Sequence, residues 1–317
     1  MKAVLLDWAT MGPDLDVTEL RALLPDLEFY DDTDDDQVAE RVAGAEIVLG
    51  NKVLISESLF ANAPKMRFIG LTATGTDNVD LVAAKKHGVA VANIRAYCTA
   101  SVVEHVFGCL LNLAHKLGPY ATDVRAGKWQ KAEDFCMLTH PISELSAMTL
   151  GIVGYGELGK GVARMADAFG MAVIVAARPG TVEVPSDRVS MDELLARADA
   201  ISLHCPLNEA TRGLFGAAEF KAMKNTAILI NTARGGLVDS SALAGALRDG
   251  EIAAAAVDVL PTEPPANGDP LLDYQGSNLL VTPHIAWGTL TGRQNAIDEL
   301  TANIAAFLSG KERCRVV

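Results

Sequence analysis

GYGELG, formed by Gly154, Tyr155, Gly156, Glu157, Leu158 and Gly159, indicates the architecture of this chain more firmly than any other segment. It follows the apolar run Thr149–Val153 and opens a helical pattern at Lys160–Phe169. A GxGxxG pattern between a strand and a helix is typical of a dinucleotide-binding turn. The first glycine allows the tight turn, the second lets the backbone approach a pyrophosphate, and the third lets the helix pack on its strand. We therefore expect these six residues to bind a dinucleotide at the helix N-terminus.

Strand-like apolar runs alternate with helical patterns on both sides of this turn. The expected strands are Lys2–Asp7, Glu46–Gly50, Arg67–Leu71, Val89–Asn93, Thr149–Val153, Ala172–Ala177, Ala200–His204, Ala227–Asn231, Ala253–Val257 and Asn278–Thr282. Such spacing predicts βα units whose parallel sheets are covered by helices on both faces. We expect an α/β protein with two Rossmann-like or flavodoxin-like domains and a cleft between them.

The domain boundaries follow from two helical patterns. The first runs from Thr99 to Gly118, where Gly118-Pro119 predicts its end, and a new βαβ series begins after Met148. The second covers Gly292–Ser309, and its return to the first domain would make that domain discontinuous. We expect a dinucleotide-binding domain over residues 98–286 and a substrate domain over residues 1–97 plus 287–317.

The composition excludes several classes of protein. The 317 residues carry a formal charge of −13, so the surface as a whole repels nucleic acid and anionic membranes. No apolar run approaches the roughly 18 residues that span a bilayer, and the N-terminal MKAVLLDWAT lacks the pattern of a signal peptide. The five cysteines are scattered, which favours free thiols in a reducing compartment over a disulfide framework or a metal site. We expect a cytoplasmic protein without a metal ion.

The end of the second strand of the dinucleotide domain bears on the choice of cofactor. NAD-binding units place an acidic residue about 20 residues after the glycine turn, where it binds the ribose 2′-hydroxyl. Here that position is Ala177, and Arg178 follows it. A missing carboxylate removes the repulsion of a 2′-phosphate, and a guanidinium pairs with it. The pattern favours NADP(H); NAD(H) is the alternative if Arg178 only stacks on adenine or points into solvent.

Three later segments each follow a strand-like run. They are INTARGGLVD at 230–239, DVLPTEPP at 258–265 and VTPHIAWG at 281–288. Residues at the carboxyl ends of parallel strands face the ligand crevice of an open α/β sheet. We therefore expect polar side chains from these three segments to meet at one site.

The candidate catalytic residues in these segments are Arg234, Glu263 and His284. An imidazole such as that of His284 changes charge near neutral pH, so it can give a proton to a carbonyl oxygen or remove one from an alcohol. A carboxylate bonded to the ring fixes its tautomer, and the planar fork of Arg234 suits a substrate carboxylate next to a ketone. Together the three residue types predict the reduction of a 2-oxoacid.

The chain resembles the D-isomer-specific 2-hydroxyacid dehydrogenase family along essentially its full length. The matching segments, in order, are GYGELG, SLHCPL, MKNTAILINTARGGLVD, DVLPTEPP and TPHIAW. The resemblance implies that Arg234 binds and polarises the substrate, Glu263 orients the base, and His284 is the acid and base. The Glu–His pair differs from the Gln–His pair of formate dehydrogenases, which counts against formate as the substrate.

The resemblance also implies roles for residues outside the catalytic set. Backbone N–H groups at Thr74 and Gly75 would hold the substrate carboxylate, and Asp258 would bind the nicotinamide carboxamide. Independently of the resemblance, the bulk of Trp287, three residues after His284, predicts that it either narrows the substrate pocket or packs against the cofactor. The further cofactor contacts that it implies are Cys205, Pro206, Thr211, Thr232, Ala233, Arg234, His284 and Ala286.

The identity of the substrate depends on finer similarities. The TPHIAW segment and the stretch Tyr97–Ser101 resemble the glycerate dehydrogenase and hydroxypyruvate reductase branch, which implies hydroxypyruvate or glyoxylate as the oxidised substrate. A larger or phosphorylated 2-oxoacid is the alternative within enzymes, although we expect no C-terminal regulatory domain of the kind found in many phosphoglycerate dehydrogenases. The C-terminal-binding corepressors, which also resemble this family, represent a non-enzymatic alternative. The family further implies a homodimer formed through the segment near Thr99–Trp129.

Overall fold

The structure is a computed structural model that describes residues 1–181 and 183–317, and the chain forms two compact units. The first unit comprises Met1–Cys98 and Gly288–Val317, and the second comprises Thr99–Trp287. These bounds differ by one residue from the domain bounds expected from the sequence. Among the described helices, none has the length and apolar character needed to cross a membrane.

The first unit contains a five-stranded parallel sheet in the order β2-β1-β3-β4-β5. Its strands are β1 (Ala3–Leu5), β2 (Leu27–Phe29), β3 (Ile47–Gly50), β4 (Phe68–Leu71) and β5 (Ala90–Ala92). This order is that of flavodoxin-like folds, in which the chain changes direction across the sheet between its first and third strands. Strands β1, β3, β4 and β5 are buried along their whole length, which explains their unbroken apolar sequences.

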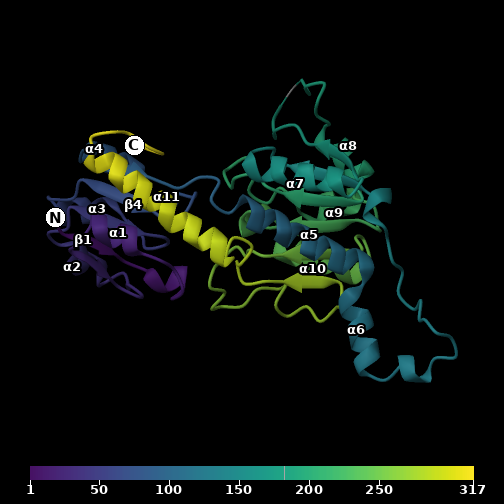
Figure 1. Ribbon diagram of the computed structural model, residues 1–317. Coiled ribbons are helices and arrows are strands. Elements are labelled where there is room, and N and C mark those ends of the chain that lie inside the picture. The colour runs from purple at the N-terminus through teal and green to yellow at the C-terminus, as the bar shows by residue number, and fades with distance from the viewer. Residues whose placement is uncertain (182) are drawn as a thin grey trace. The chain divides into compact units, whose positions relative to one another are not determined.

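Helices cover this sheet on both faces. They are α1 (Thr18–Leu23), α2 (Val38–Val42), α3 (Glu57–Asn62), α4 (Leu81–Lys86) and α11 (Leu290–Leu308), with a 3₁₀ turn at Trp8–Met11. Figure 1 shows α11 in yellow, and this helix packs on β4 and α1. Gly70 in β4 permits that packing, because a Cβ there would lie 2.7 Å from Cδ1 of Leu300 on α11. The C-terminal segment of the chain therefore completes the core of the N-terminal unit.

The second unit contains a six-stranded sheet in the order β11-β10-β9-β8-β6-β7. Its strands are β6 (Thr149–Val153), β7 (Ala172–Val175), β8 (Ala200–Leu203), β9 (Ile228–Asn231), β10 (Ala254–Val257) and β11 (Leu279–Val281). All pairs are parallel, and an isolated parallel bridge between Ala176 and Val189 continues the sheet beyond β7. With that bridge the order becomes the Rossmann order, so the fold class predicted from the sequence is confirmed.

Of the described helices of the second unit, two precede its first strand and the other four alternate with its strands. They are α5 (Thr99–His115), α6 (Leu117–Arg125), α7 (Glu157–Ala168), α8 (Met191–Arg197), α9 (Ala217–Ala222) and α10 (Ser240–Asp249), with 3₁₀ turns at Trp129–Lys131, Leu145–Ala147 and Gly235–Leu237. Helix α5 packs on α7 through Gly161, where a Cβ would lie 2.9 Å from Val103. Helix α6 extends from the end of α5 away from the sheet (Figure 1).

Two expectations about the elements are wrong, and one strand was not expected. The long helix ends at His115 rather than at Gly118-Pro119, because Lys116 adopts a left-handed conformation with φ +54°. Pro119 then lies in the first turn of α6, where its missing N–H removes no hydrogen bond. Helix α7 begins at Glu157, within the glycine turn, rather than at Lys160. Strand β2 was not expected, because three residues with a central exposed Glu28 carry no clear strand pattern.

Candidate active site and cofactor cavity

The three glycines of the turn between β6 and α7 differ in their surroundings. Gly154 has φ +96°, and a Cβ there would lie 2.5 Å from the backbone nitrogen of Cys205. A Cβ on Gly159 would lie 2.1 Å from the carbonyl oxygen of Gly154. Gly156 is the N-cap of α7 and would meet nothing within 4 Å. Two glycines are thus required by backbone contact, whereas the third leaves open space at a helix N-terminus, where phosphates bind.

A cavity of about 700 Å³ adjoins this turn. Of the cofactor contacts expected from the sequence, it is lined by Gly154, Tyr155, Gly156, Ala177, Arg178, Cys205, Pro206 and Thr211. Its volume lies in the range of small-molecule and cofactor sites. The open backbone at Gly156 and this cavity together fit the phosphates and adenosine of a dinucleotide.

Several residues that line the cavity were not identified by sequence reasoning, among them Arg188 and His204. Arg188 lies with its guanidinium carbon 4.8 Å from the centroid of the Tyr155 ring, and it pairs with Asp187. His204 lies at the end of β8, where its Nε2 is 2.8 Å from Oγ of Ser202. Burial lowers the pKa of His204 to about 4, so its ring is neutral at physiological pH. No motif identifies Arg188, since the parallel bridge at Val189 is what brings it to the cavity.

His284 and Glu263 form a direct pair. Nδ1 of His284 lies 2.6 Å from Oε2 of Glu263, and Oε1 of Glu263 accepts a hydrogen bond from the backbone N–H of Leu260 at 2.8 Å. The two side chains are 29% and 32% exposed. Because Glu263 engages Nδ1, the pair leaves Nε2 of the ring for another partner. The arrangement therefore suits proton transfer at Nε2 with the tautomer set by Glu263.

Asp258 shapes the turn that presents His284. Its buried carboxylate accepts the backbone N–H groups of Ile285 at 2.9 Å and Ala286 at 2.8 Å, and also the hydroxyl of Thr282. Its carbonyl oxygen accepts the N–H of His284 at 2.8 Å. These bonds hold His284 at φ +56°, a conformation that few non-glycine residues adopt. The structure thus gives Asp258 a positioning role, and its contact with a nicotinamide stays a prediction.

The loop of Arg234 lies against the loop of Glu263. A Cβ on Gly235 would lie 1.9 Å from the carbonyl carbon of Leu260, so only glycine allows this approach. Nδ2 of Asn231 donates to the carbonyl oxygen of Arg234 at 2.9 Å, which fixes the start of the loop at the end of β9. Arg234, Glu263 and His284 therefore follow β9, β10 and β11, three neighbouring strands of one sheet.

The other expected site residues have varied surroundings. Glu157 and Leu158 form the first turn of α7, and Oγ1 of Thr232 is buried without a hydrogen-bond partner. Nε1 of Trp287 donates to the carbonyl oxygen of His284 at 3.1 Å. Thr74 belongs to the first unit, where its hydroxyl donates to the carbonyl oxygen of Ile94 at 3.0 Å. Within the described residues, Glu157, Leu158, Gly159, Thr232, Ala233, Asp258, His284 and Ala286 do not line the 700 Å³ cavity.

The NAD binding domain of D-isomer specific 2-hydroxyacid dehydrogenases matches residues 107–286 of this chain. The chain belongs to that family. It is 44% identical over 276 residues to glycerate dehydrogenase of Methylorubrum extorquens, covering 87% of each chain. It is 38% identical to hydroxypyruvate reductase of Blautia hydrogenotrophica over 317 residues, covering 98% of each. Its fold is similar to that of the TT0316 protein of Thermus thermophilus, with a TM-score of 0.87, 32% identity and full coverage of both chains.

These findings confirm the family, fold class and enzyme class predicted from the sequence. As a D-2-hydroxyacid dehydrogenase, the chain is an oxidoreductase that uses a nicotinamide cofactor. The glycine turn, the cavity and the buried hydroxyl of Thr232 are the features of this chain that fit such a cofactor. Among the described residues, no group of three or more His, Cys, Asp or Glu side chains is arranged to hold a metal ion.

Proposed function

We propose that this dehydrogenase reduces hydroxypyruvate to D-glycerate and also reduces glyoxylate to its 2-hydroxyacid. It would also catalyse the reverse oxidations. The His284–Glu263 pair, with 2.6 Å between Nδ1 and Oε2, is the observation that carries this proposal. Relatives named glycerate dehydrogenase and hydroxypyruvate reductase support the choice of a small 2-oxoacid.

In this proposal His284 gives a proton from Nε2 to the 2-oxo oxygen, and takes it back from the alcohol in the reverse direction. Glu263 is a positioning residue that keeps the ring proton on Nδ1 and stabilises the charged ring. The bound nicotinamide supplies the hydride for the carbonyl carbon. Turnover then depends on the orientation of His284, which Asp258 and Trp287 fix through backbone bonds.

The proposed substrate contacts are Arg234 and the backbone at Thr74 and Gly75. The guanidinium of Arg234 can bind a carboxylate with two parallel hydrogen bonds and polarise the adjacent ketone. The loop contact at Gly235 supports this role, because it leaves Arg234 little freedom relative to the loop of Glu263. Trp287 is proposed to limit the size of the substrate side chain.

We propose NADP(H) as the preferred cofactor, with NAD(H) accepted less well. Ala177 and Arg178 both line the cavity beside the glycine turn. Ala177 offers no carboxylate to a ribose 2′-hydroxyl, and Arg178 offers a cation to a 2′-phosphate. The proposed holding residues are the turn Gly154–Gly159 for the pyrophosphate and Cys205, Pro206 and Thr211 for the adenosine.

A substrate panel tests the activity. Oxidation of NADPH and of NADH is measured separately with hydroxypyruvate, glyoxylate, pyruvate and a phosphorylated 2-oxoacid. The proposal expects the highest kcat/KM with hydroxypyruvate or glyoxylate, and a higher value with NADPH than with NADH. A clear preference for the phosphorylated acid would replace the proposed substrate. Cofactor binding without turnover on any of these acids would favour a larger substrate or a binding protein.

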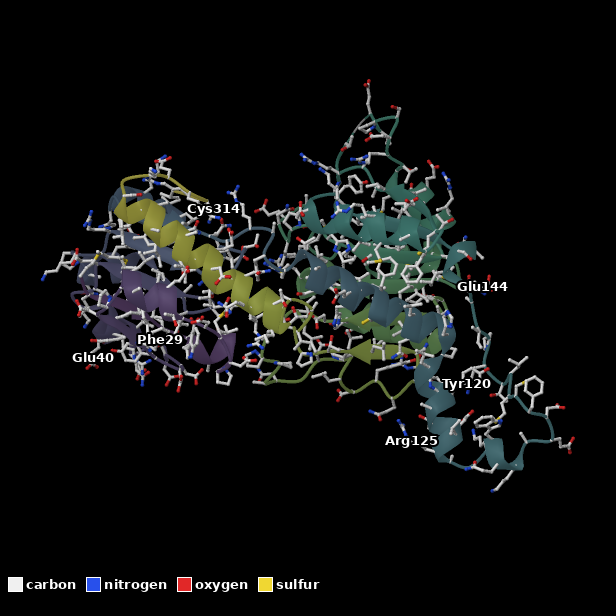
Figure 2. The ribbon with its side chains drawn as sticks, viewed as in Figure 1. Phe29, Glu40, Tyr120, Arg125, Glu144 and Cys314 are labelled. Atoms are coloured by element: carbon white, nitrogen blue, oxygen red, sulfur yellow. The ribbon has the colours of Figure 1, made fainter. Side chains whose placement is uncertain are left out.

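We also propose a homodimer formed through the segment near Thr99–Trp129 and its continuation. Figure 2 labels Tyr120 and Arg125 on α6, and beyond this helix Phe135 is 90% and Leu138 is 80% exposed. Such apolar exposure is typical of a surface that a partner covers. Light scattering should report a dimer at micromolar concentration and a monomer for the double variant F135S/L138S. The matched control V82S changes a side chain that is 83% exposed on α4 of the first unit and should stay dimeric.

The cytoplasm is the proposed compartment, because the five cysteines are free thiols and a reducing environment keeps them so. Fractionation of the source cells with activity as the readout checks this assignment. Activity outside the cytoplasmic fraction would contradict it.

A further inference from the structure

Arg188 is held beside the end of β7 by backbone hydrogen bonds. The N–H of Ala177 donates to the carbonyl oxygen of Val189 at 2.8 Å, and the N–H of Val189 donates to Val175 at 2.9 Å. Because Val189 pairs with Ala176, the alternation of side chains along a strand places Arg188 on the opposite face from Val189. This pairing brings Arg188, ten positions after Arg178 in the sequence, to the cavity that Arg178 also lines.

The side chain of Arg188 is oriented by two further contacts. Its guanidinium carbon lies 4.8 Å from the ring centroid of Tyr155, the second residue of the glycine turn. One of its nitrogens, Nη1, donates to the carbonyl oxygen of Asp187 at 2.9 Å and to the Asp187 carboxylate. The side chain is 25% exposed and lines the same cavity as Arg178. A guanidinium fixed against an aromatic ring keeps its other N–H groups free to bind an anion.

The charges around the cavity favour an anion at this end. The charged side chains that line it are Arg178, Asp187 and Arg188, and the neutral ring of His204 adds no charge. Two cations and one anion leave a net positive charge beside the position where the sequence lacks the usual carboxylate, Ala177. A phosphate on the adenosine ribose is the group of the cofactor that this end would distinguish.

We infer that Arg188 is a specificity-determining residue that binds the 2′-phosphate of NADP(H) together with Arg178. The inference rests on the proposed NADP(H) preference and extends it, since Arg178 is then one of two cations rather than the only one. Asp187 works against the 2′-phosphate by its charge while it orients Arg188. The two residues therefore have effects of opposite sign on the same ligand.

Calorimetry with two nucleotides tests the inference without any turnover. Binding of 2′,5′-ADP and of 5′-ADP to the full chain is measured for the wild type, R188Q, R188K and R178Q. R188Q should lower the affinity for 2′,5′-ADP by about tenfold, because the variant loses charge-assisted hydrogen bonds to the phosphate. Its affinity for 5′-ADP should stay within about twofold, which also shows that the variant is folded. R188K should lie between R188Q and the wild type, because lysine keeps the charge and loses the planar fork.

Two further variants sharpen the result. D187N should raise the affinity for 2′,5′-ADP and leave the affinity for 5′-ADP unchanged, because it removes a negative charge beside the phosphate. Weaker binding of 5′-ADP to D187N would instead assign Asp187 to the ribose hydroxyls and overturn the inference. R197Q is the matched control, since Arg197 pairs with Glu193 on α8 and does not line the cavity. It should bind both nucleotides as the wild type does.

The outcomes separate this inference from the proposal on which it rests. If the wild type prefers 2′,5′-ADP and R188Q keeps that preference, Arg188 has no part in it and the inference fails alone. Equal weakening of both nucleotides by R188Q also overturns the inference, since Arg188 would then support only the shared adenosine. If the wild type binds the two nucleotides equally, the NADP(H) preference fails and the inference fails with it.

Discussion

The two parallel sheets of this chain use the same topological position in opposite ways. In the first unit the position lies between β1 and β3, and the buried carboxylate of Asp7 occupies it. Asp7 accepts the backbone N–H groups of Asn51 at 2.9 Å, Lys52 at 2.6 Å and Val53 at 3.2 Å. In the second unit the position lies between β6 and β8, where Gly154 approaches His204 and Cys205 without a side chain and a cavity lies beside it.

This difference shows that the strand order does not by itself make a ligand site. Open α/β sheets bind ligands where the strand order reverses, and both sheets provide such a crevice. In the first unit, the carboxylate of Asp7 accepts hydrogen bonds from the surrounding backbone N–H groups, so the crevice is filled by a structural contact. In the other unit, glycines leave open space beside a cavity, which we propose as the cofactor site. The chemistry of a few residues therefore decides the use of a shared architecture.

The largest effect should come from removing a reacting group in the second unit. His284→Ala should lower kcat with hydroxypyruvate by about 10²- to 10⁴-fold, the usual contribution of a general acid. Binding of 2′,5′-ADP should be unchanged, because the imidazole does not line the adenosine cavity. The control is His87→Ala, which removes an exposed imidazole stacked on Phe60 in the first unit. Near-normal turnover of His284→Ala would exclude this residue as the acid.

A matched pair of glycine variants should separate a structural from a ligand-binding role. Gly154→Ala places a Cβ 2.5 Å from backbone atoms at a positive φ, so it should lower the free energy of unfolding by about 3 kcal/mol and weaken 5′-ADP. Gly156→Ala meets open space, so it should change stability by less than about 0.5 kcal/mol and still weaken 5′-ADP. Urea unfolding and calorimetry measure the two effects. Equal destabilisation by both variants would contradict the proposed division of roles.

A smaller effect should follow from disturbing the filled crevice. Asp7→Asn replaces one carboxylate oxygen by an NH₂ group that faces backbone N–H donors. It should lower the free energy of unfolding by about 1–3 kcal/mol, the range for buried groups that lose their partners. Affinity for 2′,5′-ADP should not change, since Asp7 belongs to the first unit and the cavity to the second. A variant that lost nucleotide binding at unchanged stability would break the comparison between the two crevices.

The sequence was most informative where a local pattern and the fold agree. The apolar runs predicted ten of the described strands, and the motifs predicted the cavity residues at Gly154–Gly156 and Cys205-Pro206. In contrast, the turn at Lys116 depends on a left-handed conformation that lysine rarely adopts, so no local signal marks it. Arg188 was missed for a different reason. Its place in the cavity depends on a single parallel bridge at Val189. Pairing between separate segments of this kind leaves no local sequence pattern from which it could be predicted.

The discontinuity of the first unit has a consequence for protein synthesis. Residues 1–98 leave the ribosome first, but the helix that covers β4 at Gly70 is α11, near the end of the chain. The second unit is contiguous, so all of its strands are available before α11 has been made. The apolar face of β4 that α11 covers therefore stays exposed until α11 has been made, while the second unit can already fold. In contrast to most multidomain chains, whose N-terminal domain folds first, we expect the order of completion here to be the reverse of the order of translation.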